Sequence, residues 1–427
     1  MLVVALLSVA THLTSQSGTD IREIGSGDDL DAMNDLARRA FGPGAGAGSP
    51  EDVARRRART GQAVADQRVY GAFSGGRMVA AASWHDMRQW WHGRSLPMAG
   101  VAGVMVAPEF RGRGVGRTLM TEVLAAIARR GYPLSVLYPA TTPIYRSLGW
   151  EMAGGDYRAG LPARSLRSLL TPDISRNTPG TLADGPAGAL HAAPFERATP
   201  DDAEAVIAVV GQAHQLARHS GPNTRDAATV AAWLADPDLF AYLAPDGFLA
   251  YRWGRDHELR VERIVAATER TLRELWSIVA SHSSIADTVT ARVAPDDPIF
   301  WLTREPDTYL KFHEMWMLRL VDVAAAVRGR GFPLSAQLSL PLSIQDDTRE
   351  DNAGLFELSV TGGRGTLVHA PEATHPLTIG VRGLAALYAG TPMASLRLAG
   401  LASGGDPAAD SELDGAFGGA SFLLDNF

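Results

Sequence analysis

A short run of arginine and glycine between a predicted strand and a predicted helix has residue types suited to binding an anion. The run reads Arg111-Gly112-Arg113-Gly114-Val115-Gly116-Arg117, and apolar residues then recur at helical spacing. Backbone N–H groups at a helix start attract an anion, and glycine lets a phosphate approach the backbone closely. The three arginines can neutralise further phosphates. The run therefore predicts a site for a diphosphate.

Three nucleotide-binding motifs can be compared with this run. The sequence has no G-x-x-x-x-G-K-[ST], which excludes a P-loop, and Gly-Arg-Gly-Val-Gly-Arg does not satisfy the Rossmann pattern G-x-G-x-x-G. What remains is R-x-x-G-x-G after a strand. This motif resembles the diphosphate loop of the GNAT acyl-CoA transferases, and the resemblance implies acetyl-CoA as the ligand.

A tyrosine in a second motif suits acid catalysis. The segment 143–150 reads PIYRSLGW and resembles the second GNAT signature, in which an aromatic residue precedes a small-residue turn and a glycine–aromatic pair. A phenol has a pKa of about 10, so Tyr145 is protonated at neutral pH and can donate to a leaving thiolate. Tyr138 and Tyr157 rank below Tyr145 because neither belongs to the signature.

The elements around these motifs divide the chain into three units. Residues 21–180 alternate predicted strands and helices, which is typical of an α/β layered domain. Residues 195–305 repeat this order, which indicates a diverged duplication. Residues 315–427 form the third unit. Residues 171–194, rich in Pro, Gly and Ala, predict a linker between the first two units.

The second and third units differ from the first in ways that bear on function. No glycine run follows the predicted strand 259–266, so we expect the second unit to be a structural domain that binds no acetyl-CoA. The third unit combines alternating strands with a helix at 381–388. It ends on the apolar segment 422–427, which does not resemble a frayed polar terminus and invites a functional interpretation.

Along most of its length the chain resembles the Eis (enhanced intracellular survival) family of N-acetyltransferases. The matching segments are 107–114, 144–150, Leu275-Trp276 with Ser281-His282-Ser283, 315–323, 383–388 and the terminal Phe427. The resemblance implies an α/β (α+β) protein with two tandem GNAT-like domains and a sterol-carrier-protein-like C-terminal domain. It also implies a homohexamer, and transfer of acetyl groups to amines such as aminoglycosides or lysine side chains.

The resemblance assigns roles to individual residues. Tyr145 is the general acid, and the C-terminal carboxylate of Phe427 is the general base. The oxyanion meets a backbone N–H of Val104 or Val106. The expected acetyl-CoA contacts are Val104, Met105, Val106, Arg111, Gly112, Arg113, Gly114, Val115, Gly116, Arg117, Ala140 and Thr141. Trp84, His85 and Trp90 are candidates for the acceptor pocket, the two tryptophans through cation–π contacts with an amine.

Composition narrows the partners. The chain has 427 residues, no cysteine and a formal charge of −7, which excludes cysteine chemistry, argues against nucleic acid and favours a small cationic acceptor. The eleven histidines form no H-x-x-x-H or H-E-x-x-H pair, so we expect no metal. The apolar run 2–10 has no basic residue before it and is too short to span a bilayer, so we expect no membrane partner, a cytoplasmic protein, and an N-terminal extension, 1–20, of doubtful status.

Several alternatives remain open at this level. The third unit resembles a lipid-carrier fold and could bind an apolar ligand, which would not require Tyr145. A transferase narrowly specific for one protein or peptide would share both motifs. Tyr145 and Phe427 could simply pack, and the tryptophans could belong to the core.

Overall fold

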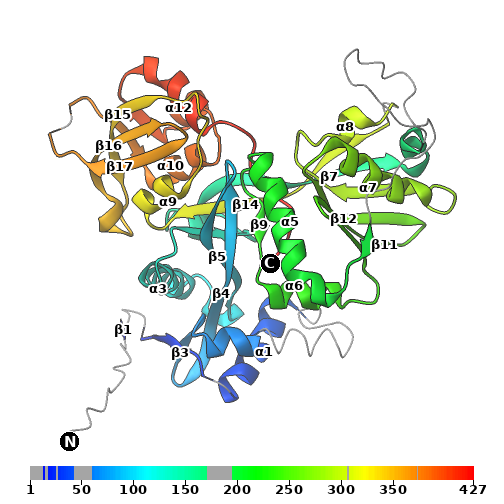
Figure 1. The fold of residues 1–427 in the computed structure, drawn as a ribbon. Coiled ribbons are helices and arrows are strands. Elements are labelled where there is room, and N and C mark those ends of the chain that lie inside the picture. The colour runs from blue at the N-terminus through cyan, green and yellow to red at the C-terminus, as the bar shows by residue number, and fades with distance from the viewer. Residues whose placement is uncertain are drawn as a thin grey trace, which may run out of the picture.

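The computed structural model describes residues 13–14, 18–25, 27–42, 60–170, 195–304, 307–372 and 374–427. Most of the N-terminal extension and the whole predicted linker at 171–194 lie outside these ranges. Figure 1 shows three bodies along the chain: a first domain in blue and cyan, a second in green and yellow, and a third in orange and red.

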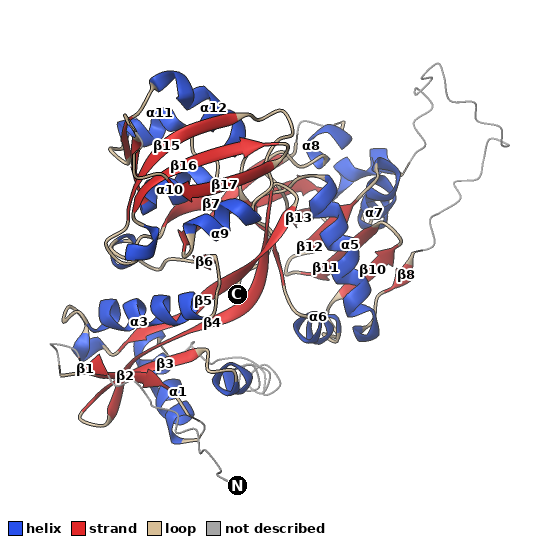
Figure 2. Cartoon of the chain, turned by 60° about the vertical axis from the view of Figure 1, so that its left-hand side comes forward, coloured by secondary structure: helices blue, strands red, loops and turns tan. Residues whose placement is uncertain are grey.

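The first domain is a twisted sheet with helices on both faces. Its strands are β1 (Leu13–Thr14), β2 (Asp20–Glu23), β3 (Val69–Ser74), β4 (Arg77–Trp91), β5 (Arg94–Val106), β6 (Leu134–Leu137) and β7 (Glu151–Pro162). Its helices include α1 (Asp28–Phe41), α3 (Val115–Arg129) and the short α4 (Pro143–Arg146). One core packs the apolar stripe of α3 on the sheet, and a separate core packs α1 on the opposite face. Figure 2 shows the sheet between these two helices.

The second domain repeats this order of elements. Its strands are β8 (Glu196–Arg197), β9 (Asn223–Thr224), β10 (Phe240–Ala244), β11 (Gly247–Trp253), β12 (Glu258–Ala266) and β13 (Thr288–Arg292). Its helices are α5 (Ala203–Leu216), α6 (Ala227–Leu234), α7 (Glu269–Ser281) and α8 (Ile299–Leu302). In both domains a hairpin leads into a long helix and a strand parallel to the hairpin's second strand, so β5, α3 and β6 correspond to β12, α7 and β13.

The two domains share one continuous sheet because a strand from each reaches the other. Strand β14 (Tyr309–Leu320) pairs antiparallel with both β6 and β7, and β7 also pairs with β13. The sequence predicted that residue 315 opens the third unit, whereas the structure places this strand in the large sheet. The reason is that the C-terminal part of β14 is buried on both faces: Met317 contacts the core under α3, and Trp316 and Leu318 contact the core of the third domain.

The third domain is a five-stranded sheet covered by helices. Its strands, in spatial order, are β17 (Arg364–His369), β16 (Gly354–Thr361), β15 (Leu338–Gln345), β18 (Leu377–Gly380) and β19 (Ala402–Gly404). Its helices are α9 (Val323–Gly329), α10 (Val381–Tyr388), α11 (Met393–Leu398) and α12 (Asp410–Phe417). The helix predicted at 381–388 is α10.

The chain leaves the third domain after α12 and returns to the middle of the molecule. Residues 421–427, called the tail below, include β20 (Phe422–Leu423), which pairs in parallel with β7. Figures 1 and 2 both show the C-terminus beside the β4–β5 hairpin and α6. The tail's apolar side chains Phe422, Leu423 and Leu424 are buried. The third domain thus delivers the C-terminus to the junction of the first two domains.

Candidate active site

Strand β5 extends beyond its parallel neighbour and leaves an opening in the first domain. The two strands pair from Met98 opposite Leu134 to Val101 opposite Leu137, where β6 ends, while β5 continues to Val106. On its other edge the register with β4 shifts, so Gly103 and Val104 face the single residue Ala82, and Gly103 has a φ of +62°. This β-bulge bends β5 away from β6. We call the gap beyond Val101 and Leu137 the first opening.

The glycine-rich run, residues 112–117, lies at the start of α3 and forms an open cradle. Gly112 and Gly114 have φ angles of +75° and +78°, and a Cβ on either would meet no atom within 4 Å. No side chain caps the helix at Gly114, so its first N–H groups face outward without an intrahelical partner. Gly116 differs, because a Cβ there would lie 3.2 Å from Val106 and 3.3 Å from Ile144. The cradle therefore fits an anionic group such as a diphosphate.

The three arginines of the run do different things. The Arg111 guanidinium donates to the backbone carbonyls of Val106 (3.3 Å) and Ala40 (3.1 Å), so it fastens the loop to β5 and α1. Arg113 lies over the Phe110 ring at 5.5 Å. Arg113 and Arg117 are exposed, and within the described ranges neither pairs with a carboxylate. These two arginines are available to phosphates.

The other predicted acetyl-CoA contacts surround the first opening in different ways. Val104 and Val106 are half-buried and pack toward the α3 core. Met105 points to the opposite face and is buried in the α1 core, so only its backbone can contribute. Ala140 and Thr141 are exposed in the loop between β6 and α4.

Tyr145 lies on α4, beside the cradle. Its helix is positioned by Ile144, which approaches Gly116 at the start of α3. Tyr145 is 6% exposed, its ring meets Trp150 edge-on at 6.4 Å, and its hydroxyl has no hydrogen-bond partner among the described residues. Burial raises the pKa of this phenol to about 12. The hydroxyl therefore stays protonated and ready to donate.

The turn that carries Tyr145 is held by a charge network from the third domain. Arg146 donates from Nε to one oxygen of Glu151 at 2.9 Å, and Arg382 of α10 donates from Nε to the other at 2.8 Å. Burial would raise the pKa of the Glu151 carboxyl, but hydrogen bonds from the Met152 N–H and from the two arginines outweigh it and keep the pKa below its usual value. Glu151 thus remains ionised and ties α4 to the third domain.

The C-terminal residue lies against the centre of β5. The Phe427 ring is 5.5 Å from the Tyr138 ring and 6.4 Å from the His85 ring. A Cβ on Gly100 would lie 2.9 Å from the Phe427 ring, so this glycine makes room for it. Phe427 is half-buried, and its carboxylate makes no ion pair with the described residues.

A cavity of about 1040 Å³ opens next to the tail. Its wall draws on the first domain, the second domain and the tail, and includes His85, Asp86, Asp226, Glu262 and Asp425. Six carboxylate residues and four arginines line it in total. A volume of this size accommodates a small-molecule acceptor.

The structure separates the three residues predicted for the acceptor pocket. His85 lines the cavity. Trp84 does not, because neighbouring residues of a strand point to opposite faces, and its ring is fully buried under α3 and stacked on Tyr70 at 6.0 Å. Trp90 does not line it either: its Nε1 donates to Thr224 at 3.0 Å, and its ring packs on His214 in the seam between domains.

Residues outside the predicted site surround the tail. They are Tyr138, Arg225, Arg263 and Arg292, which contact it, and its own Asp425. No local motif contains them. Tyr138 ranked low for want of a signature, yet its hydroxyl donates to the Asp425 carbonyl at 3.0 Å.

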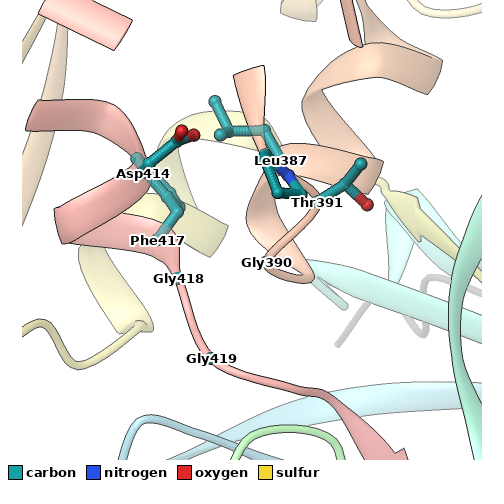
Figure 3. Close-up of a pocket in the computed structure, with 8 residues that line it drawn as sticks. Leu387, Gly390, Thr391, Asp414, Phe417, Gly418 and Gly419 are labelled. Atoms are coloured by element: carbon teal, nitrogen blue, oxygen red, sulfur yellow. The ribbon is translucent and has the colours of Figure 1, made fainter. Parts of the chain in front are cut away.

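The third domain has a small cavity at the base of the tail. It measures about 170 Å³ and lies where α10 and α12 meet the loops that follow them. Figure 3 shows Leu387 and Asp414 facing each other across it. Pockets for small ligands usually span about 300–1,000 Å³, so this cavity does not favour an apolar ligand.

Within the described ranges, no three His, Asp or Glu side chains come together as a metal site would require. None of the helices in those ranges has the length and apolar character needed to cross a membrane.

Three stretches of the chain match known domain families. Residues 20–153 match the acetyltransferase (GNAT) domain, residues 216–320 match another acetyltransferase (GNAT) domain, and residues 323–422 match the sterol carrier protein domain. These matches confirm the predicted fold class: two tandem GNAT domains followed by a sterol-carrier-like domain.

Similar proteins span two thirds of the chain or more. A crystal structure of a GCN5-related N-acetyltransferase from Kribbella flavida is 41% identical, with a TM-score of 0.86 over 96% of this chain and 98% of that one. The N-acetyltransferase Eis of Mycobacterium tuberculosis is 28% identical over 308 residues, 69% of this chain and 71% of the relative. Eis1 from Mycobacterium abscessus, at 23% identity, shares the fold with a TM-score of 0.71 over 96% of this chain and 100% of that one. The predicted resemblance to Eis is confirmed, and the chain belongs to the GCN5-related N-acetyltransferases, among the three-domain enzymes similar to Eis.

Proposed function

We propose that this N-acetyltransferase uses acetyl-CoA and acts on small cationic amines, such as aminoglycosides or lysine side chains, in the cytoplasm where acetyl-CoA is made. The observation that carries the proposal is the open cradle at Gly112 and Gly114, which adjoins Tyr145. The cradle offers unpartnered helix N–H groups and two exposed arginines to a diphosphate.

The cavity beside the tail supports a cationic acceptor. Four of its six carboxylates form ion pairs with arginines, which leaves Asp86 and Asp226 on the wall to attract and orient a cationic amine. His85 lies on the cavity wall and its ring contacts the Phe427 ring, so the C-terminal residue lies beside the cavity.

The chain's residues suit direct transfer. The amine attacks the thioester carbonyl, a C–N bond forms, and the C–S bond breaks. The carboxylate of Phe427 takes the ammonium proton, either directly or through a bridging water. The water relay would compensate for the weak basicity of a carboxylate. Tyr145 donates its proton to the departing thiolate, and an N–H of Val104 or Val106 stabilises the oxyanion. With no cysteine in the chain, no acetyl-cysteine intermediate can form.

The same proposal includes a homohexamer. Exposed apolar side chains gather on β14 and α8: Trp301, Tyr309, Leu310, Phe312 and Met315. Exposed apolar side chains on these elements support an interface between chains. Sedimentation of the purified protein tests the assembly.

Thiol release from acetyl-CoA tests the function. Because the chain has no cysteine, every thiol that reacts with a disulfide dye is coenzyme A. We expect turnover with several aminoglycosides or polyamines, its loss in Tyr145→Phe, and its retention in the matched control Tyr157→Phe. Turnover with one protein or peptide alone would replace this proposal with a narrow acetylase. No release with any amine would contradict it.

A further inference from the structure

The second domain has an opening that corresponds to the first. Strands β12 and β13 pair in parallel from Glu258 opposite Thr288 to Val261 opposite Ala291. Strand β12 then continues to Ala266, while β13 ends one residue later at Arg292. The register between β11 and β12 shifts at the same place. We call the gap beyond Val261 and Ala291 the second opening.

The tail fills the second opening. Strand β7 pairs with β13 as far as Arg158 opposite Arg292, and its next residues, Asp156 and Gly155, pair with β20 instead. The tail therefore continues the sheet where β13 stops. Its backbone is in close contact there, because a Cβ on Gly154 or Gly221 would clash with the tail.

Arginines of the second domain bind the tail's polar groups through an ion pair and hydrogen bonds. Arg263 of β12, 7% exposed, pairs with the Asp425 carboxylate at 2.6 Å. Arg292 donates to the Leu424 carbonyl at 2.9 Å, and Arg225 donates to the Asn426 carbonyl at 2.5 Å. Burial would raise the pKa of Asp425, but Arg263 and Arg225 outweigh it and hold that pKa below its usual value. Burying an arginine without such a partner would lower the stability of the fold. The site around Arg263 therefore suits a segment that carries a carboxylate, as the tail does at Asp425.

The second opening does not suit a diphosphate. Helix α7 is preceded by Thr268, whose side chain caps the helix by accepting from the Thr271 N–H. The Asp246 carboxylate accepts from both threonine hydroxyls, at 2.8 and 2.6 Å, and so places negative charge at the helix start. An anion is repelled from the position that the glycine cradle offers in the first domain.

We propose that the second domain is a binding site for the chain's own C-terminal segment, and that Arg263, through Asp425, positions the Phe427 carboxylate in the first domain. The catalytic consequence rests on the proposed function, but the binding itself does not. Arg263 is thus a positioning residue that acts through the tail.

Release of Phe427 from the full-length protein by a carboxypeptidase, followed by mass spectrometry, tests whether the second domain binds the tail. This measurement does not depend on acetyltransferase activity. We expect release at least about tenfold faster in Arg263→Met and in Asp425→Asn, because each removes half of a buried ion pair. Arg263→Lys should restore most of the protection. Arg260→Met is the matched control: Arg260 lies on the same strand and pairs with Glu258 at 2.7 Å, away from the tail.

Kinetics on the same variants test positioning. The loosened variants should lose at least about tenfold in kcat while the KM for acetyl-CoA stays unchanged, since the cradle is intact. Unchanged Phe427 release in Asp425→Asn, which alters only the tail, would overturn the proposed binding site. Faster release with unchanged kcat would overturn positioning by Arg263. A wild-type enzyme inactive toward amines would instead overturn the proposed function. The release assay would then still test whether the second domain binds the tail.

Discussion

Strands β5 and β12 each extend beyond a parallel neighbour, but the helices that follow them, α3 and α7, start differently. In the first domain α3 starts at Gly114 in the left-handed region with no side-chain cap. In the second, α7 starts with the Thr268 cap and the Asp246 carboxylate. The same backbone arrangement thus offers an anion site in one domain and a closed helix start in the other. A few loop residues, rather than the fold, decide which ligand an opening accepts.

The short helices that follow the openings differ in the same sense. Helices α4 and α8 both follow the parallel strand, and Pro143-Ile144-Tyr145 in the first domain corresponds to Pro298-Ile299-Phe300 in the second. The second domain therefore has a phenyl ring where the first has a phenol. It lacks both the cradle and the proposed acid, and its opening is occupied by the tail.

Exchanging the two rings should give the largest effect. Tyr145→Phe should lower kcat by about 100- to 10,000-fold, the usual contribution of a general acid, with little change in the KM for acetyl-CoA. Phe300→Tyr is the reciprocal change and should leave kcat unchanged. Steady-state thiol release measures both. Activity retained in Tyr145→Phe would remove the functional distinction between the two helices.

A side chain in the cradle should give the next largest effect. Gly114→Val places a branched residue at a φ of +78° and fills the space that a phosphate would occupy. The lost charge-assisted hydrogen bonds, each about 1.5–3 kcal/mol, should raise the KM for acetyl-CoA by about 10- to 100-fold. Gly75→Val is the matched control, with a φ of +56° in an exposed turn away from the site. Equal KM changes in the two variants would show that strain, not the cradle, is responsible.

Loss of the cap on α7 in the second domain should change stability but not acetyl-CoA binding. Thr268→Ala removes the side chain that caps α7 and should lower the free energy of unfolding by about 1 kcal/mol. The KM for acetyl-CoA should not change, because α7 faces no diphosphate. Denaturant unfolding and steady-state kinetics on one preparation give both quantities. A raised KM would indicate that the second opening also binds acetyl-CoA.

The smallest expected effect is on the pH dependence of kcat, which should show no fall on the alkaline side. Burial raises the pKa of Tyr145 to about 12, above its ordinary value, so the protonated, donating form persists as pH rises and is lost only near pH 12. At saturating substrates, kcat should therefore stay level up to about pH 10. A fall in kcat centred below pH 9, absent from the buffer controls, would exclude Tyr145 as the acid.

Local signatures made the cradle and the tyrosine turn predictable from the sequence. Gly112, Gly114 and Tyr145 lie in short motifs whose backbone geometry depends on adjacent residues. Trp84 does not line the cavity. The sequence could not show this, because apolar residues lie on both faces of the predicted strand around it. The place of β14 also escaped prediction, since an apolar strand does not specify which sheet edge it joins.

Contacts between distant segments account for the rest. Arg263 and Asp425 carry no motif and meet only because the third domain returns the chain to the second opening. A buried arginine in the strand predicted at 259–266 was a possible signal, but its partner could not be identified from the sequence. Tyr138 gains its role in the same way, through the carbonyl of Asp425.

Isothermal titration with acetyl-CoA, without an amine acceptor, tests the difference between the two openings most directly. The structure predicts one molecule bound per chain, with binding weakened by Gly114→Val and unaffected by Thr268→Ala. Two molecules per chain, or one whose binding is insensitive to Gly114→Val, would contradict the account that the first opening takes acetyl-CoA and the second takes the tail.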